Sequence, residues 1–251
     1  HTNFFMQPVW NFLQQHPGVN LLTGMEGFRF LDEQHKTTFS QKIPNTSIYF
    51  DSYNSAVLLN NQGIRVYHKS KLVPGVETLP FFLHFLDSWF EKFGGTTGGY
   101  TGQVERTVLK SGKIKIAPAI CYESIYGEFM SKYINNGANI IAVITNDGWW
   151  GNTPGYKQHM NYARLLAVET GCWVVHCANT GISCFINPQG QVYNPQSWNT
   201  VAAIKMSVPL INSKTFFVLH GDIISRLAII GAIIIIFWNT IVMIKRKRSH
   251  R

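Results

Sequence analysis

The chain has 251 residues, of which 45% are hydrophobic and 14% aromatic, so it is long enough for one large core or two small ones. Its 22 basic and 13 acidic side chains give a formal net charge of +9, a balance that ordinarily indicates nucleic acid or an anionic membrane as a partner. Five of the positive charges lie in the last seven residues, directly after an apolar segment. They therefore indicate membrane topology, and we expect no nucleic-acid binding.

The first part of the chain carries the signals of a short helix, a strand and a hairpin. It begins at His1 and not at methionine, so we expect a processed or truncated piece of a longer protein. No internal repeat or low-complexity linker follows, which favours a single extramembrane domain over residues 1–222. The predicted elements are a helix at 8–15, a buried strand at 20–25, and hairpin strands at 54–59 and 64–68 joined by a turn at 60–63.

Residues 79–102 are rich in aromatic residues and glycine. Apolar side chains recur there at helical spacing and then spread nearly all round the predicted helix at 79–93. So wide an apolar surface either packs in the core or contacts a membrane or an acyl chain, and the sequence leaves both alternatives open. The glycines that follow fit a loop that opens.

Cys121 stands where a predicted strand at 113–120 meets a helix-like pattern. Ser124 is expected to cap that helix, and Gly137 to follow its end. A cysteine at such a turn can project its sulfur from the sheet edge, while the helix N-terminus lowers the pKa of its thiol. A nucleophile and a buried structural cysteine are the two interpretations of this position.

Strands and helices alternate downstream of the cysteine, which favours a layered α/β domain. Thr153 is expected to cap a helix that begins at Pro154 and runs to Thr170. The predicted strands of this part lie at 138–145, 172–178 and 182–188, with an edge strand after the turn at 187–190.

The other three cysteines show neither a CxxC pair nor a regular zinc spacing. Cys172, His176 and Cys177 lie on one strand-like run, whose alternation sends neighbouring side chains to opposite faces. We therefore expect no metal site and no cofactor. An oxidising compartment permits a disulfide among Cys172, Cys177 and Cys184, although nothing in the sequence specifies a pair.

A segment of 18 uncharged residues, at 227–244, is long enough at about 1.5 Å per residue to cross the hydrocarbon core of a bilayer. A buried strand or core helix is the alternative, but strands rarely exceed about ten residues and a basic tail follows at once. We predict a transmembrane helix over residues 223–244. The positive-inside rule places the tail, 245–251, in the cytoplasm and the globular part on the other side.

Five motifs follow one another along the chain: YHKSKLVPGVE, AICYES, TNDGWWG, QHMNYARLLAVETG and NTGISCFINPQG. With them, residues 20–244 resemble the carbon-nitrogen hydrolase (nitrilase) superfamily and, within it, the family of apolipoprotein N-acyltransferases. The resemblance implies an α/β fold, a nitrilase-like four-layer α-β-β-α sandwich, followed by one C-terminal transmembrane helix. It also implies transfer of a fatty acyl chain from a phospholipid to the N-terminal amine of a lipoprotein, on the periplasmic side of the bacterial inner membrane.

The resemblance implies a cysteine, a lysine and a glutamate as catalytic residues. A thiolate attacks an ester carbonyl, an ammonium favours the thiolate and later the oxyanion, and a carboxylate takes and returns the proton. Cys121 matches the nucleophile. Lys69, and not Lys71, matches the lysine, because LVP follows after two further residues and Glu77 stands eight positions on.

The catalytic glutamate is apparently missing from this chain. The family carries it in a proline-glutamate motif before the strand at 20–25, and nothing upstream of Asn20 offers one. Glu26 follows that strand and is not given the role. We expect an absent N-terminal portion that holds the base and the earlier membrane helices, so the activity of the fragment alone is in doubt.

Five residues match positions that the family uses around the active site: Glu77, Tyr122, Glu123, Trp149 and Trp150. Glu123 is placed either to orient Lys69 or the incoming amine, or simply as an acidic residue at a helix N-terminus. The two tryptophans belong either to a loop near the substrate entrance or to the core. PGVE departs from the family, which carries phenylalanine before the glycine, so the acyl or phospholipid preference is expected to differ.

Two other functions remain open from the sequence. One is a membrane-tethered amidase or nitrilase of the same fold that uses water as the acceptor; the apolar loop and terminal helix argue against it. The other is a non-catalytic, membrane-anchored binding module, which the missing glutamate favours.

Overall fold

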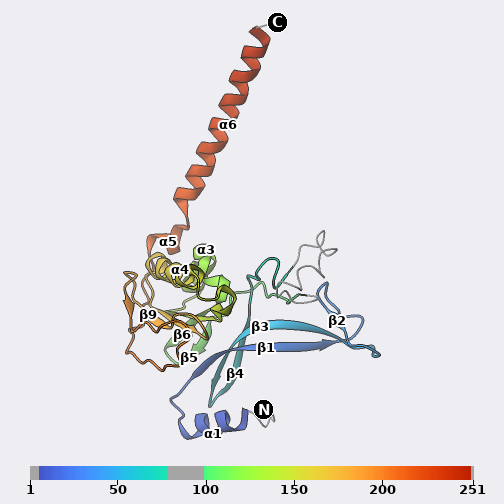
Figure 1. The fold of residues 1–251 in the computed structure, drawn as a ribbon, viewed down its shortest axis with the longest axis vertical. Helices are drawn as coiled ribbons and strands as arrows, with labels where there is room; N and C mark the ends of the chain where they lie inside the picture. The colour runs from blue at the N-terminus through green and yellow to red at the C-terminus, as the bar shows by residue number, and fades with distance from the viewer. Residues whose placement is uncertain (1–5, 79–98, 250–251) are drawn as a thin grey trace.

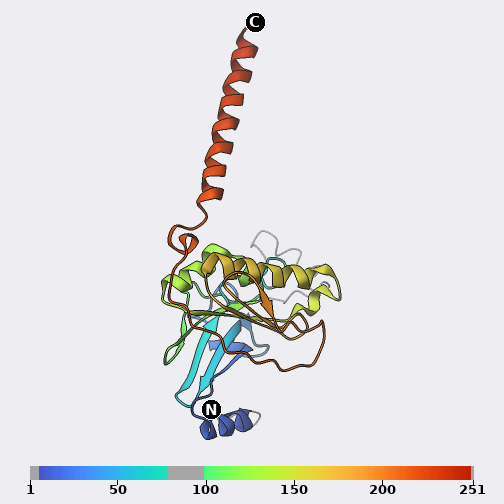
Figure 2. The ribbon, with the colours of Figure 1, turned by 90° about the vertical axis from the view of Figure 1, so that its left-hand side faces the viewer.

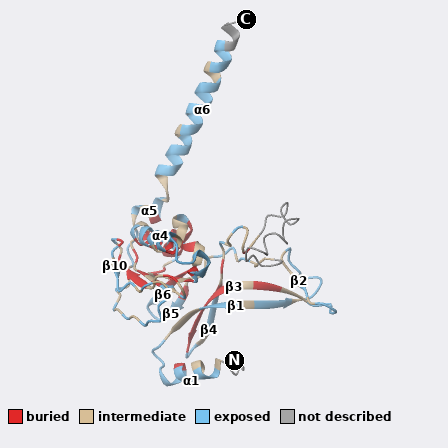
Figure 3. Cartoon of the chain, in the orientation of Figure 1, coloured by how far each residue is buried: buried red, intermediate tan, exposed pale blue. Residues whose placement is uncertain are grey.

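Two β-sheets lie face to face, with helices outside them and one long helix leaving the domain (Figure 1, Figure 2). The structure is a computed structural model that describes residues 6–78 and 99–249. Buried residues concentrate where sheets and helices meet, whereas residues 223–246 of the long helix, the part whose burial is described, include none (Figure 3). The predicted aromatic helix at 79–93 lies outside the described residues.

The first sheet is antiparallel and is built around one long strand, β3. The turn that was predicted at 60–63 is confirmed, and Gly63 has a φ of +129°, which glycine adopts without steric cost. The strands are β1 (Leu21–Leu31), β2 (Gln41–Lys42), β3 (Tyr49–Asn60) and β4 (Gly63–His68), with β1 on one side of β3 and both β2 and β4 on the other.

β1 is longer than the strand predicted at 20–25. Its second half pairs with β3 as far as Leu31↔Tyr49 although Phe28 and Phe30 are exposed. Main-chain pairing and not burial holds this half in place, so its side chains lack the burial pattern by which a strand is recognised.

The second sheet has six strands in the order β10-β9-β8-β7-β6-β5. The three central strands run parallel, and their carboxyl ends therefore meet at one edge of the sheet. The strands are β5 (Leu109–Ser111), β6 (Ile114–Ile120), β7 (Ile140–Thr145), β8 (Val174–Ala178), β9 (Cys184–Ile186) and β10 (Val192–Tyr193).

Two helices connect the parallel strands and cover the outer face of this sheet: α3 (Gly127–Asn135) and α4 (Pro154–Thr170). The predicted boundaries of α4 are confirmed, because Thr153 accepts a hydrogen bond from Gly155 and Gly171 follows at a φ of +66°. The predicted start of α3 is wrong. A short 3₁₀ helix, η3 (Cys121–Ile125), comes first, and Ser124 lies inside it.

The inner faces of the two sheets form the main core. Ala56, Leu58 and Tyr67 of the first sheet pack with Ile116 and Ala117 of the second, and all are buried. On the opposite face of the first sheet, α1 (Gln7–Gln15) inserts Leu13 against Val57 and Leu59. The order helix, sheet, sheet, helix confirms the predicted α-β-β-α sandwich.

The chain ends in a short helix, α5 (Phe216–His220), and a long one, α6 (Ile223–Ser249). α6 projects away from the domain (Figure 1). Among the described residues it is the one helix long and apolar enough to cross a membrane, over Ile223–Arg246, and no side chain in its apolar window is buried. The predicted apolar C-terminal helix is therefore present.

Candidate active site

Cys121 follows β6 directly and begins η3, at the edge where the parallel strands end. Its φ is +50°, a left-handed conformation that costs a residue with a Cβ about 1–3 kcal/mol and persists only where its surroundings enforce it. The side chain is partly buried and the thiol is free. The strand-to-helix turn thus places one strained cysteine at the sheet edge.

The pKa of the Cys121 thiol is raised, which corrects the expectation that a helix N-terminus lowers it. Burial raises the pKa most; the charge of Lys69 and a hydrogen bond with Thr145 lower it, but by less. A thiolate at this position depends on the nearby ammonium group and not on the five-residue 3₁₀ helix.

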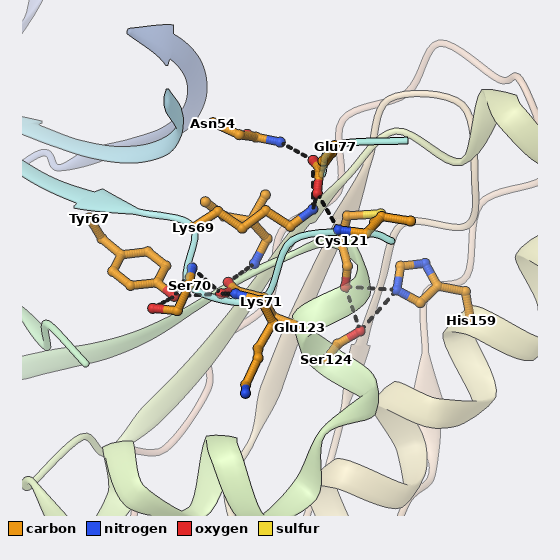
Figure 4. Close-up of polar contacts among 12 residues, drawn as sticks. Asn54, Tyr67, Lys69, Ser70, Lys71, Glu77, Cys121, Glu123, Ser124 and His159 are labelled. Carbon is orange, nitrogen blue, oxygen red and sulfur yellow. Dashed lines mark hydrogen bonds and ion pairs between the residues drawn. The ribbon is translucent and has the colours of Figure 1, made fainter. Parts of the chain in front are cut away.

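Lys69 follows β4 and is almost completely buried, with 1% of its surface exposed. Its Nζ donates to both carboxylate oxygens of Glu77, at 2.8 and 2.7 Å (Figure 4). Its backbone N–H donates to the carbonyl oxygen of Asn54 on β3, 2.8 Å away. The lysine that the resemblance singles out is therefore held in a buried ion pair next to Cys121.

Glu77 has no free acceptor position in this arrangement. Besides the two bonds from Lys69, its Oε1 accepts from Asn54 Nδ2 at 3.0 Å and its Oε2 from the Val73 N–H at 2.8 Å. A carboxylate offers about four lone-pair sites, and four hydrogen bonds from three donor groups occupy them. Glu77 can hold Lys69 in place, but it is not placed to take the proton of the Cys121 thiol.

Glu123 connects the lysine loop to the cysteine turn through the backbone. Its Oε1 accepts from the backbone N–H groups of Ser70 and Lys71, at 2.7 and 3.0 Å, and from the Tyr67 hydroxyl at 2.6 Å. Its Oε2 accepts from the Ile120 N–H at 2.9 Å. The side chain is fully buried, so burial raises the pKa of Glu123 although these hydrogen bonds oppose the shift. Of the two sequence interpretations, the acidic residue at a helix N-terminus is confirmed: Glu123 lies in the first turn of η3 and accepts from the N–H of its N-cap residue, Ile120.

His159 and Asp147 support the turn at Cys121 through hydrogen bonds, and the sequence analysis assigned them no role. His159 Nδ1 lies 2.8 Å from Asp147 Oδ1, while its Nε2 lies 2.9 Å from Ser124 Oγ and 3.0 Å from the Cys121 carbonyl oxygen. Burial raises the pKa of Asp147, but the hydrogen bond and charge of His159 outweigh it and the pKa is lowered. The backbone of Cys121 is thus held by a buried imidazole that a carboxylate orients.

His176, which lies beside this pair, is neutral. Its ring centroid is 5.6 Å from that of His159, and its Nδ1–H donates to the Ile182 carbonyl oxygen at 2.8 Å. Complete burial lowers the pKa of His176 to about 4.

Cys172 and Cys184 are buried, Cys177 is exposed, and all four cysteines are free. The described residues contain no group of His, Cys, Asp and Glu that could hold a metal ion.

The aromatic residues of the site differ in exposure. Tyr122 is half-buried and packs edge-to-face on Tyr126, with ring centroids 5.3 Å apart. Trp149 and Trp150, on the 3₁₀ helix η4 (Asp147–Trp150) that follows β7, are 63% and 50% exposed. The alternative that the tryptophans pack in the core is therefore wrong. The Trp150 ring lies over Gly155, where any Cβ would be within 3 Å of the ring.

Glu26 lies on β1 opposite Asn54, is exposed, and accepts a hydrogen bond from Tyr100 at 3.1 Å. Burial and the Glu26 charge raise the pKa of Tyr100 to about 12. The site therefore combines a thiol, a buried ammonium and two buried carboxylates that each accept four hydrogen bonds. It is equipped to attack a carbonyl carbon and to stabilise an oxyanion.

Comparison with known proteins gives the same family as the sequence motifs. The sequence model of the carbon-nitrogen hydrolase family matches residues 20–212. The apolipoprotein N-acyltransferase of Chlorobaculum tepidum is 31% identical over 190 residues, which are 72% of this chain and 35% of that protein. That of Agrobacterium fabrum is 40% identical over 144 residues, or 56% of this chain and 27% of that protein. The chain spans about a third of the length of the curated relatives it matches.

Solved structures show the same fold. An amidase from Nesterenkonia sp. AN1 superposes with a TM-score of 0.51 at 15% identity, over 77% of this chain and 62% of the amidase. Another structure of that amidase, described as a member of the nitrilase superfamily, gives a TM-score of 0.50 at 15% identity, over 76% of this chain and 61% of the amidase. At this identity the likeness concerns the fold alone. With the family match over most of its length, the chain belongs to the carbon-nitrogen hydrolase family.

Proposed function

We propose that this chain is the catalytic part of an N-acyltransferase that moves a fatty acyl chain from a phospholipid to the N-terminal amine of a diacylglyceryl-cysteine lipoprotein. The observation that carries the proposal is the buried Lys69–Glu77 pair beside the strained Cys121, in a chain that ends in an apolar helix. The similarity to proteins named apolipoprotein N-acyltransferase supports the substrate class.

In the first half-reaction the Cys121 thiolate attacks the ester carbonyl carbon of the phospholipid. A tetrahedral oxyanion forms, and the Lys69 ammonium lies where it can stabilise the negative charge. The carbon-oxygen bond to the glycerol then breaks, lysophospholipid leaves with the proton given up by the thiol, and the acyl group stays on sulfur as a thioester.

In the second half-reaction the α-amine of the lipoprotein attacks the thioester carbonyl carbon. The carbon-sulfur bond breaks, an amide forms, and the proton lost by the amine restores the thiol. We assign the base that carries this proton to no described residue, because Glu77 is held by four hydrogen bonds and Glu123 is engaged by backbone N–H groups and the Tyr67 hydroxyl. We propose that a glutamate of the kind the resemblance implies serves as that base.

Tyr122 and the exposed Trp149 and Trp150 are the residues we propose to contact the substrates at the mouth of the site. In the orientation that we propose, α6 crosses the membrane, the catalytic domain lies on the periplasmic side and the basic tail is cytoplasmic. The phospholipid then reaches Cys121 from the bilayer in which the chain is anchored.

The test is to trap the thioester. The full chain in neutral detergent is incubated with a phospholipid and its intact mass is measured, with alkaline hydroxylamine used to release the adduct. We expect one acyl mass on Cys121, none on Cys121→Ala, and an unchanged adduct on Cys177→Ala, which removes an exposed cysteine. An adduct that persists in Cys121→Ala would refute the proposal.

The same preparation separates a transferase from a hydrolase. When a peptide with a diacylglyceryl-cysteine N-terminus is added, a transferase forms an N-acyl peptide. Release of free fatty acid with no acylated peptide would instead identify water as the acceptor.

A further inference from the structure

A groove separate from the candidate active site lies next to the first turns of α6, where the domain meets the apolar helix. It is about 630 Å³ in volume and is bounded by α3, by the first turns of α6 and by the loop after β4. Its lining includes Lys71, the second lysine of the KSKL motif, for which the candidate active site has no use. Figure 4 shows the Lys71 side chain running away from Lys69 and Cys121.

One wall of the groove is cationic. Lys71 Nζ lies 5.7 Å from the ring centroids of both Tyr126 and Phe129, and the Arg106 guanidinium lies 4.6 Å from that of Phe129. Lys132 of α3 adds a third positive charge. Among the described residues none of these three cations forms an ion pair, and Arg106 Nε donates to the Phe129 carbonyl oxygen at 3.3 Å.

The acidic residues on the other wall are already engaged. Glu128 Oε1 accepts from Arg226 Nη2 at 2.6 Å and from the Asp222 N–H at 2.9 Å, and Asp222 itself accepts from the Ser225 N–H at 2.9 Å. Burial, with the charge of Asp222, raises the pKa of the remaining carboxyl, Glu169. The lining therefore holds four basic and three acidic side chains, and the ion pair of Arg226 with Glu128 leaves the three cations of the other wall facing two carboxyl groups, Asp222 and Glu169.

The position of the groove selects the ligand. Arg226, which lines it, is the last charged residue before the uncharged stretch at 227–244, and Ile229, one turn further along α6, lines it too. If α6 crosses a bilayer, which is part of the proposed function, the groove sits at the level of the lipid phosphates. Phe217 and Ile229 offer apolar surface to the first part of an acyl chain.

We propose that this groove binds the phosphodiester headgroup of an anionic membrane phospholipid, at a site separate from Cys121. The phosphate lies against Lys71, Arg106 and Lys132, and the lipid chains follow Ile229 into the bilayer. Lys69 and Lys71 lie on the same loop, so a headgroup bound at Lys71 contacts the loop that carries Lys69. Glu123 links this loop to the cysteine turn, because it accepts hydrogen bonds from the N–H groups of Lys71 and Ile120. The lipid there stays intact and is not the acyl donor.

The test measures lipid affinity without the transfer reaction. The full chain carrying Cys121→Ala, which cannot form a thioester, is titrated in neutral detergent with phosphatidylglycerol, and the bound fraction is read by native mass spectrometry. Lys71→Gln with Lys132→Gln removes two exposed cations from the groove. Lys110→Gln with Lys113→Gln, at the β5–β6 turn far from α6, removes the same charge elsewhere.

A basic side chain near a membrane surface is worth a factor of about five in affinity for an anionic lipid, so we expect a loss of roughly 25-fold for the groove variant and little change for its control. Equal losses in both variants would reduce the effect to net charge and overturn the proposal. It would also fail if diacylglycerol, which lacks the phosphate, bound as tightly, or if glycerol phosphate bound as tightly as the lipid. None of these outcomes depends on whether Cys121 forms a thioester, so the two proposals fail separately.

Discussion

Replacing Lys69 by methionine tests whether removing one partner of its ion pair with Glu77 carries the stability cost of breaking a buried pair. Both partners are nearly inaccessible, with side-chain exposures of 1% and 10% and an Nζ–Oε2 distance of 2.7 Å. Lys69→Met removes two of the four hydrogen bonds to the carboxylate and leaves its charge without a counterion. Breaking a buried pair on one side costs about 3–5 kcal/mol, and we expect the free energy of unfolding to fall by that amount.

A double variant shows whether the charge is the cause. Adding Glu77→Gln to Lys69→Met removes the uncompensated carboxylate while keeping one acceptor for Asn54 or Val73. We expect the double variant to regain about 2 kcal/mol relative to the single one, because no buried charge remains. Both lack the ammonium near Cys121, so we expect both to lose thiol reactivity, and Lys69→Met to lose more, because the remaining Glu77 charge raises the pKa of Cys121.

Urea titration in neutral detergent gives these free energies, with labelling of the buried Cys172 and Cys184 thiols reporting unfolding. The exposed pair Lys36–Glu33, 2.8 Å long, is the matched control, and Lys36→Met should leave the midpoint unchanged. If Lys69→Met behaved like Lys36→Met, or if the double variant were less stable than the single one, the buried-pair account would be wrong.

Three further predictions concern the cysteine turn. His159→Ala removes the imidazole from the Cys121 carbonyl and leaves the buried Asp147 carboxylate without its partner, so iodoacetamide should alkylate Cys121 more slowly and the free energy of unfolding should fall by more than in Glu123→Gln; a normal alkylation rate would contradict the positioning role. Glu123→Gln replaces an acceptor by an NH₂ group and leaves at least one buried N–H or hydroxyl unsatisfied, so urea titration should show a loss of about 1–3 kcal/mol, and a neutral substitution would show the network to be solvated. Because the pKa of Cys121 is raised, the thiol is the favoured form at neutral pH and its alkylation rate should still be rising above pH about 8.5, the ordinary thiol value; a plateau below that pH would refute the burial argument.

The parts of the fold that could be predicted depend on local signals. Thr153, Pro154 and Gly171 mark the ends of α4 within a few residues of the helix they bound. The apolar run of α6 needs only composition and length. Ser124 misled because a serine before a helical pattern usually caps it, whereas here its hydroxyl bonds the Cys121 carbonyl and His159 inside a 3₁₀ turn.

The parts of the site that could not be predicted depend on contacts between distant residues. Glu123 reaches backbone groups at Ser70 and Lys71, more than fifty positions away. His159 lies 38 positions from the carbonyl it touches, and nothing in its own segment distinguishes it from another helical residue. The resemblance indicates Lys69 and Glu77, and their pairing needs only a tight loop, because they lie eight positions apart.

Glu77 and Glu123 both hold parts of the active site in place through buried carboxylates. Each is buried, and each accepts four hydrogen bonds, so neither carboxylate can reorient without breaking hydrogen bonds. The lysine loop and the cysteine turn are thereby fixed relative to each other before any substrate arrives, which is what an electrostatic site requires. Burial works against the Cys121 thiolate, and Lys69 favours it. An acyl chain that excludes water around the pair strengthens the attraction between ammonium and thiolate, because charges interact more strongly in a medium of low dielectric constant.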